Sequence, residues 1–188
     1  MPTLAPKVTA RPALNLSLYL RDRRVLLVGT GAGADERLSR LDDAGATVER
    51  IDEEAWRSGE PPEGHFFLVI GHSADDPLNA EVAQWARDHA TLAYAHDQPL
   101  YSDFAFPALA KRGPLRIAIS THGVAPALAA HLRREFEARL EASGKSLDAV
   151  LEELERVRRS FPRGPSRMQK LKEIAAKVRL VGEIAVKL

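Results

Sequence analysis

The first half of the chain alternates between short, mostly apolar stretches and segments with helical spacing. Short apolar runs are typical of strands buried in a parallel sheet. Four stretches predict such strands: Val25–Val28, Thr47–Ile51, Phe66–Ile70 and Leu92–Ala95. Apolar residues at helical spacing predict helices over 33–43 and 79–90, and glycine and proline predict a loop over 57–64. Strands that alternate with helices predict an α/β fold with a parallel sheet.

The second half has a different pattern. Phe104–Ala110 and Leu115–Ser120 predict a β-hairpin, and Pro126 suits the first turn of a helix that runs to about Leu140. Two further amphipathic helices follow, and the last begins with a capping-box pattern at Ser166. We therefore predict three domains: a nucleotide-binding domain over 1–106, a small hairpin-plus-helix unit over 107–145 and a helical C-terminal domain over 146–188.

A glycine turn directly follows the first predicted strand. In Gly29-x-Gly31-x-x-Ala34, the first glycine permits a tight turn, the second lets the backbone approach a pyrophosphate, and the small Ala34 lets helix and strand pack closely. The helix N-terminus then offers N–H groups and a positive dipole end to phosphates. We therefore expect NAD as cofactor, with these candidate contacts: Gly29, Thr30, Gly31, Ala32, Gly33, Ala34, Asp52 and Ser73.

Asp52 has two interpretations. It follows the glycine turn by about 20 residues, where an acid that binds the ribose 2′-OH is expected. It is also the first of three consecutive acids, Asp52–Glu54, that water could simply solvate. Asp76 and Asn79 suit the N-terminus of the following helix, where their side chains would cap free N–H groups.

Composition narrows the classes of function. The 188 residues carry 27 Lys and Arg against 26 Asp and Glu, a net charge of +1, which favours neither nucleic acid nor an anionic membrane as partner. The absence of cysteine excludes disulfides, thiolate catalysis and cysteine-ligated metals. No apolar run approaches the ~20 residues of a membrane span, and the N-terminal stretch lacks the apolar core of a signal peptide. We therefore expect a cytoplasmic protein.

Four segments carry a pattern that is more specific than a general dinucleotide-binding fold. They are Leu20–Gly31 with Asp43–Ala46, Ala74–Asn79, Asp97–Pro99 with Asp103–Ala108, and Arg112–Ala129. The last two are the most specific, because Phe-x-x-Pro-Ala followed by Gly-Pro-Leu-x-Ile-Ala-Ile-Ser-Thr is not a general feature of dinucleotide-binding folds. Together the four segments resemble the precorrin-2 dehydrogenase domain of sirohaem synthases.

The resemblance implies a Rossmann-type parallel sheet, a hairpin-and-helix unit through which two chains form a homodimer, and a helical C-terminal domain. It also implies NAD⁺-dependent oxidation of precorrin-2 to sirohydrochlorin, with iron insertion in some members. The family's catalytic aspartate falls on Asp97. Thr30, Glu36, His72 and His122 stand where the family has other residue types.

Asp97 follows the fourth predicted strand, at the end of the sheet where ligands bind in this fold. A carboxylate there, next to His96, could accept the proton that leaves the substrate. The alternative is that Asp97 caps the loop before Pro99. Asp103 is expected to order the turn before Phe104.

A tetrapyrrole substrate carries many carboxylates, which basic side chains and a helix N-terminus can bind. The candidate substrate-binding residues are Ser120, Thr121, His122, Arg112 and Arg116. Solvated surface charge is the alternative for each basic residue. His72, His96 and His122 match no compact metal motif, so we predict no metal site. Two rival functions stay open: an enzyme that also inserts Fe²⁺, and a non-catalytic tetrapyrrole- or nucleotide-binding homologue.

Overall fold

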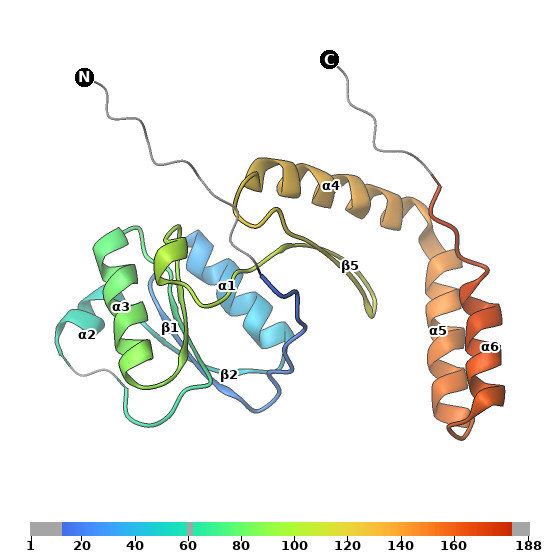
Figure 1. The fold of residues 1–188 in the computed structure, drawn as a ribbon, viewed down its shortest axis with the longest axis horizontal. Helices are drawn as coiled ribbons and strands as arrows, with labels where there is room; N and C mark the ends of the chain where they lie inside the picture. Colours follow the sequence, from blue (N-terminus) through green and yellow to red (C-terminus); the bar gives the residue numbers. More distant parts are fainter. Residues whose placement is uncertain (1–12, 60–61, 182–188) are drawn as a thin grey trace, which may run out of the picture. The chain divides into compact units, whose positions relative to one another are not determined.

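The structure is a computed structural model that describes residues 13–59 and 62–181. The chain divides into two compact units, with a boundary between Phe106 and Pro107. The first is a parallel α/β unit, and the second is built from a hairpin and helices (Figure 1). The division into domains 1–106, 107–145 and 146–188 stays a prediction.

The first unit is organised around a parallel sheet with the strand order β2-β1-β3-β4. Its strands are β1 (Arg24–Val28), β2 (Thr47–Ile51), β3 (Leu68–Gly71) and β4 (Leu92–Ala95). Its helices are α1 (Ala32–Asp43), α2 (Glu53–Arg57), α3 (Asp76–Asp88) and the short 3₁₀ helix η1 (Pro99–Tyr101). The chain leaves β1 and β3 in opposite directions along the sheet, so a topological switch point lies between these two central strands. The predicted α/β class is confirmed.

Each face of this sheet has its own core, because successive side chains of a strand point to opposite faces. Leu26 and Val69 face one core, together with Val82 of α3 and Trp56 of α2. The neighbouring strand residues face the other core, where α1 supplies Leu41. The members of that second core are Leu20, Val25, Leu27, Leu41, Leu68 and Ile70. The central strands are therefore buried on both faces, as their continuous apolar sequences predict.

Three details of the first unit differ from the sequence-based expectation. A short helix, α2, follows β2, because the Asp52 carboxylate caps it by accepting a hydrogen bond from the Ala55 N–H at 2.7 Å. Strand β3 begins at Leu68 rather than Phe66. Helix α3 begins at Asp76 with Asp75 as its N-cap, so the expected capping role of Asp76 and Asn79 was wrong.

The second unit consists of a hairpin and three described helices. Strands β5 (Ala108–Arg112) and β6 (Leu115–Ile119) pair in antiparallel register, as predicted. Helices α4 (Pro126–Ala142), α5 (Gly144–Ser160) and α6 (Pro165–Ala175) follow. A small core joins Ala110 of the hairpin to the end of α4 and the start of α5. The capping box expected at Ser166 does not form, because α6 begins one residue earlier, at Pro165.

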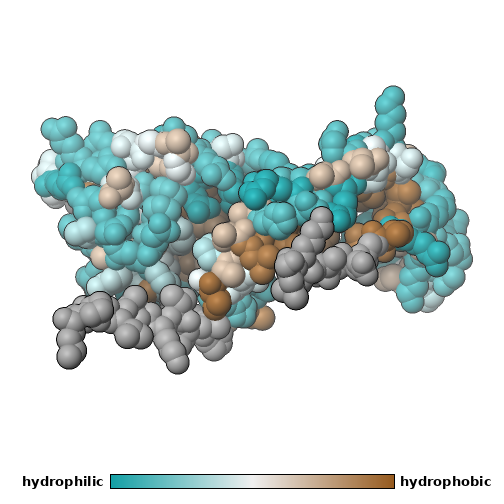
Figure 2. Space-filling model, turned by 90° about the horizontal axis from the view of Figure 1, so that it is seen from above, coloured by the Kyte–Doolittle hydropathy of each residue, from teal (hydrophilic) through white to brown (hydrophobic). Residues whose placement is uncertain are grey.

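The surface of the second unit has an apolar character. Figure 2 shows hydrophobic surface, in brown, over this part of the chain, while the surface of the first unit is mostly hydrophilic in the same view. Its exposed large apolar side chains include Val124, Leu128, Met168 and Val178. None of the helices in the described ranges has the length and apolar character that crossing a bilayer requires.

Candidate functional site

The glycine turn lies at the carboxyl end of β1, at the switch point of the sheet. Gly29 has a φ of +136°, and a β-carbon there would overlap the backbone carbonyl of His72. Gly31, with a φ of +87°, is the N-cap of α1, and within the described residues no side chain caps this helix. The free N–H groups of the first turn of α1 are therefore available to an anionic ligand, as the sequence predicts.

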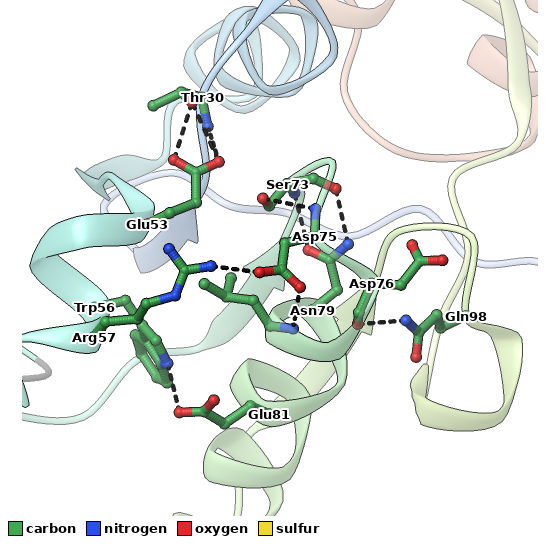
Figure 3. Close-up of polar contacts among 11 residues, drawn as sticks. Thr30, Glu53, Trp56, Arg57, Ser73, Asp75, Asp76, Asn79, Glu81 and Gln98 are labelled. Atoms are coloured by element: carbon green, nitrogen blue, oxygen red, sulfur yellow. Dashed lines mark hydrogen bonds and ion pairs between the residues drawn. The ribbon is translucent and has the colours of Figure 1, made fainter.

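Glu53 is the acid that contacts the glycine turn. Its carboxylate accepts hydrogen bonds from the backbone N–H of Thr30 at 3.2 Å and from the Thr30 hydroxyl at 3.0 Å (Figure 3). Burial raises the pKa of the Glu53 carboxyl, but hydrogen bonds from its own backbone, Ser73 and Thr30 outweigh burial, so the net pKa lies below its usual value. Sequence analysis considered Glu53 only as one of three solvated acids, whereas the structure places it at the start of the helix that Asp52 caps.

The positive charge of Arg50, near the end of β2, is neutralised by Asp35. The Arg50 guanidinium donates from Nη1 to Asp35 at 2.7 Å and from Nε to the Gly29 carbonyl at 3.0 Å. Its charge is thus matched by an acid in the first turn of α1, and its Nε–H stabilises the turn. The carboxylates of Asp52 and Glu53 add negative charge at this end of β2.

The loop after β3 is fixed by a buried amide. Asn79, which has no exposed surface, accepts a hydrogen bond from the Ser73 N–H and donates one to the Ser73 carbonyl, each at 2.9 Å. The Ser73 hydroxyl accepts from the Asp75 N–H at 3.1 Å, and Asp75 pairs with Arg57 of α2 (Figure 3). Ser73 therefore lies in a rigid loop beside the glycine turn.

Two histidines stack at the ends of β3 and β4. The rings of His72 and His96 lie 3.9 Å apart, centre to centre, with 14° between their planes. Burial, the neighbouring His96 and Arg37 together lower the pKa of His72 to about 4, so its ring is neutral near pH 7. A β-carbon on Gly33 would overlap Nε2 of His72, which places this ring against the start of α1.

Asp97 follows His96 and projects from the same edge of the sheet. Its side chain is 82% exposed, and its carboxylate Oδ2 lies 3.6 Å from Nε2 of His96. Its φ of +53° is a left-handed conformation that costs energy in a residue other than glycine. Asp103 plays the structural part expected of it, because its carboxylate accepts a hydrogen bond from the Ala93 N–H at 2.9 Å.

The remaining candidates lie in the second unit. Thr121 Oγ1 accepts from the Ala125 N–H and Ser120 Oγ from the His122 N–H, each at 3.2 Å. These bonds shape the turn before α4, where His122 is exposed with a φ of +51°. Arg116 is also exposed, and its guanidinium donates to the Leu115 carbonyl at 3.0 Å.

The Arg112 guanidinium has protein partners on each of its nitrogens. It forms a two-point pair with Asp148 of α5, at 2.7 and 2.6 Å, and also donates to the Leu140 carbonyl at 3.0 Å. These bonds join the hairpin to the end of α4 and the start of α5. In the ranges that the structure describes, no group of three or more His, Asp or Glu side chains is arranged to hold a metal ion.

The strand order, the glycine turn at the switch point and the uncapped start of α1 define a Rossmann-type dinucleotide-binding unit. Residues 16–108 match a family described as NAD(P)-binding, and residues 112–139 match one described as the central part of sirohaem biosynthesis proteins. By the second of these matches, this part of the chain is similar to sirohaem biosynthesis proteins.

Similar proteins include siroheme synthases of two bacteria. The sequence is 35% identical over 169 residues to that of Neisseria meningitidis, covering 76% of this chain and 35% of the relative. It is 34% identical over 168 residues to that of Methylococcus capsulatus, covering 79% and 35%. The chain thus spans about a third of the length of these relatives.

A solved structure, SirC, a precorrin-2 dehydrogenase, is similar in fold. It has a TM-score of 0.64 and 22% sequence identity, and the match covers 86% of this chain and 89% of SirC. At this identity the likeness concerns the fold alone.

Proposed function

We propose that the chain binds NAD⁺ and oxidises precorrin-2 to sirohydrochlorin. The observation that carries the proposal is the placement of the glycine turn and of Asp97 at the same edge of one sheet. A dinucleotide site and a carboxylate at the carboxyl ends of strands in the same sheet are what hydride and proton removal from one substrate require. The match of residues 112–139 to sirohaem biosynthesis proteins and the similarity to siroheme synthases support a tetrapyrrole as that substrate.

The residues at the switch point fit a dinucleotide. The uncapped N–H groups of Ala32, Gly33 and Ala34 would hold the pyrophosphate, and Gly29 and Gly31 supply the turn that brings the backbone close. Glu53, together with Asp52, would accept hydrogen bonds from the ribose hydroxyls, with Thr30 and Ser73 beside them. When bound, NAD⁺ supplies the acceptor for the hydride.

Asp97 acts in this proposal as the proton acceptor. Its carboxylate is exposed, so it can reach a bound substrate, and its left-handed backbone aims it outward from the end of β4. Ser120, Thr121, His122 and Arg116 would bind substrate carboxylates, since the turn before α4 presents hydroxyl and imidazole groups and β6 carries the guanidinium of Arg116. Arg112 stays a candidate from sequence, but its guanidinium is already paired with Asp148.

Two further parts of the proposal concern assembly and location. We propose a homodimer formed through the second unit, because that unit exposes large apolar side chains such as Val124 and Leu128. We also propose a cytoplasmic location. Sedimentation of the purified protein tests the first, and cell fractionation tests the second.

The deciding experiment mixes purified protein with precorrin-2 and NAD⁺ and follows the absorbance of sirohydrochlorin. We expect turnover in the wild type and none in Asp97→Ala, while calorimetry gives the same NAD⁺ affinity for both. Failure of the wild type to bind either NAD⁺ or NADP⁺ would instead indicate a non-catalytic homologue. Iron insertion into sirohydrochlorin without NAD⁺ would identify the additional ferrochelatase activity.

A second arm compares the two cofactors. Because Asp35 neutralises Arg50 and two carboxylates occupy the end of β2, the 2′-phosphate of NADP⁺ would meet net negative charge. We therefore expect calorimetry to give tighter binding of NAD⁺ than of NADP⁺ by about tenfold or more, a difference of roughly 1.4 kcal/mol. Tighter binding of NADP⁺ would contradict this part of the proposal.

A further inference from the structure

The stacked histidines have unused polar atoms. His72 is only 8% exposed, and within the described part of the chain the Nδ1 atoms of both His72 and His96 are buried without a hydrogen-bond partner. Buried polar atoms normally find partners, because leaving one unpaired costs about 1–3 kcal/mol. Two such atoms in one ring pair suggest that the pair serves a purpose other than its own stability.

The unpaired atoms determine which nitrogen of His96 carries the proton. A proton on Nδ1 would be a buried N–H with no acceptor, whereas a proton on Nε2 faces the Asp97 carboxylate at 3.6 Å. Of the two neutral tautomers, the one with its proton on Nε2 is therefore favoured. In this form the protonated Nε2 of His96 lies 3.6 Å from Oδ2 of Asp97, close enough for a small movement to form a hydrogen bond.

We propose that His96 positions the Asp97 carboxylate, and that the buried His72 ring, stacked on His96 and seated against Gly33, holds His96 in place. This inference rests on the proposed function, in which Asp97 accepts the substrate proton. His96 and His72 are positioning residues in this arrangement, and neither needs to touch the substrate.

The need for positioning follows from the exposure of Asp97. An 82% exposed carboxylate on a loop is free to rotate in water unless a neighbour restrains it, and a misplaced base slows proton transfer steeply. His96 is the group that the structure places against this carboxylate. Its contact would favour one staggered orientation of the Asp97 side chain.

His72 is suited to hold His96 because it cannot move away. One face of its ring is covered by His96, and its Nε2 lies against the α1 backbone at Gly33, where even a methyl group would not fit. The charged and titratable groups that affect it are His96, Arg37, Asp97 and Glu36, and its low pKa keeps it uncharged. A neutral ring can stack on His96 without repelling it. The contacts Gly33–His72–His96–Asp97 thus link the glycine turn to the base.

The kinetic test separates the effect of the His96 N–H from the effect of its aromatic ring. His96→Phe keeps an aromatic ring against His72 but removes the N–H, and we expect kcat to fall by about 10- to 100-fold with the affinity for NAD⁺ unchanged. His96→Gln restores a side-chain N–H and should recover part of that loss. His72→Ala removes the ring that holds His96 and should resemble His96→Phe. His65→Phe, at an exposed position before β3, is the control.

Either of two outcomes would overturn the inference: an unchanged kcat in His96→Phe, or equal losses in His96→Gln and His96→Phe. A second measurement needs no turnover. Scalar couplings measured by NMR should give one staggered χ1 rotamer for Asp97 in the wild type and in His96→Gln, and an average of rotamers in His96→Phe and His72→Ala. Rotamer averaging in the wild type also overturns the inference. A fixed rotamer in a wild type that does not oxidise precorrin-2 would leave the positioning intact and reject the proposed function.

Discussion

The imidazole of His72 fills the space in front of Gly33 that a β-carbon would need. The loop after β3 and the first turn of α1 can approach each other so closely only because position 33 carries no side chain. Gly33 therefore has a packing role in addition to the backbone N–H that it offers to a cofactor. The His72 ring that contacts Gly33 is also stacked on the His96 ring.

The first prediction is that the effect of Gly33→Ala on the free energy of unfolding changes sign when His72 is replaced by alanine. In the wild type the new methyl group overlaps His72 Nε2, and such overpacking costs about 1–3 kcal/mol of the free energy of unfolding. In His72→Ala the overlap is gone, and alanine stabilises a helix relative to glycine by up to about 1 kcal/mol. Urea unfolding of the four proteins in the cycle measures both values. An equal cost in the two backgrounds would contradict the contact.

The two glycines that open the turn should respond differently to alanine. At Gly29 a β-carbon overlaps the backbone carbonyl of His72, which cannot move without breaking the link between β1 and β3. At Gly31 nothing described lies within 4 Å of the added atom, so only the left-handed φ of +87° opposes it. We expect Gly31→Ala to fold with a loss of about 1–2 kcal/mol, and Gly29→Ala to lose more than 3 kcal/mol. Thermal unfolding followed by circular dichroism ranks the stabilities of the two variants. A smaller loss of stability in Gly29→Ala than in Gly31→Ala would contradict the prediction.

The parts of this protein that sequence reasoning predicted are those that depend on local chemistry. The strands follow from continuous apolar runs. The glycine turn follows from the positive φ angles at Gly29 and Gly31, which glycine adopts more readily than other residues. The Asp52 cap of α2 was missed because a run of three acids carries no periodicity. Its consequence, the contact of Glu53 with Thr30, depends on how the loops after two different strands meet, and no local pattern encodes that meeting.

The same limit applies to the loops after β3 and β4. His72 and His96 are 24 positions apart, and only the pairing of β3 with β4 brings their rings together. Asn79 was expected to cap a helix because it precedes an apolar helical stretch, but the helix begins earlier and turns the side chain inward onto Ser73. Sequence analysis singled out His72, His96 and Asn79, but the residues that they contact are determined by the tertiary fold.

Asn79 should be among the most sensitive polar residues of the first unit. Asn79→Ala removes both bonds to Ser73 and leaves a buried N–H and a buried carbonyl unpaired, which should cost about 2–4 kcal/mol. Asn79→Asp keeps the acceptor but loses the donor and buries a charge, so it should be no better. The control is Gln84→Ala on the exposed face of the same helix, with a change within about 0.5 kcal/mol. Urea unfolding measures all three, and similar values for Asn79→Ala and Gln84→Ala would refute the role of the amide.

The last prediction concerns acid stability and His72. In the folded protein its pKa is lowered from 6.5 to about 4, chiefly by burial and secondarily by His96 and Arg37. Between these two values the unfolded chain binds a proton that the folded chain does not, so acid favours unfolding there. The stabilising effect of a neutral His72 is complete above about pH 6.5 and is lost as the pH falls to about 4, a total of roughly 3 kcal/mol.

The comparison of wild type with His72→Phe isolates this effect, since the phenylalanine ring keeps the stack and carries no titrating group. From about pH 7.5 to about pH 4.5, the free energy of unfolding of the wild type should fall by about 2 kcal/mol more than that of His72→Phe. The carboxylates titrate in both proteins and cancel in the difference. His65→Phe removes an exposed histidine and should follow the wild type. Parallel pH curves for the wild type and His72→Phe would mean that His72 binds protons equally in the folded and unfolded chains, and its lowered pKa and neutral stack on His96 would then be wrong.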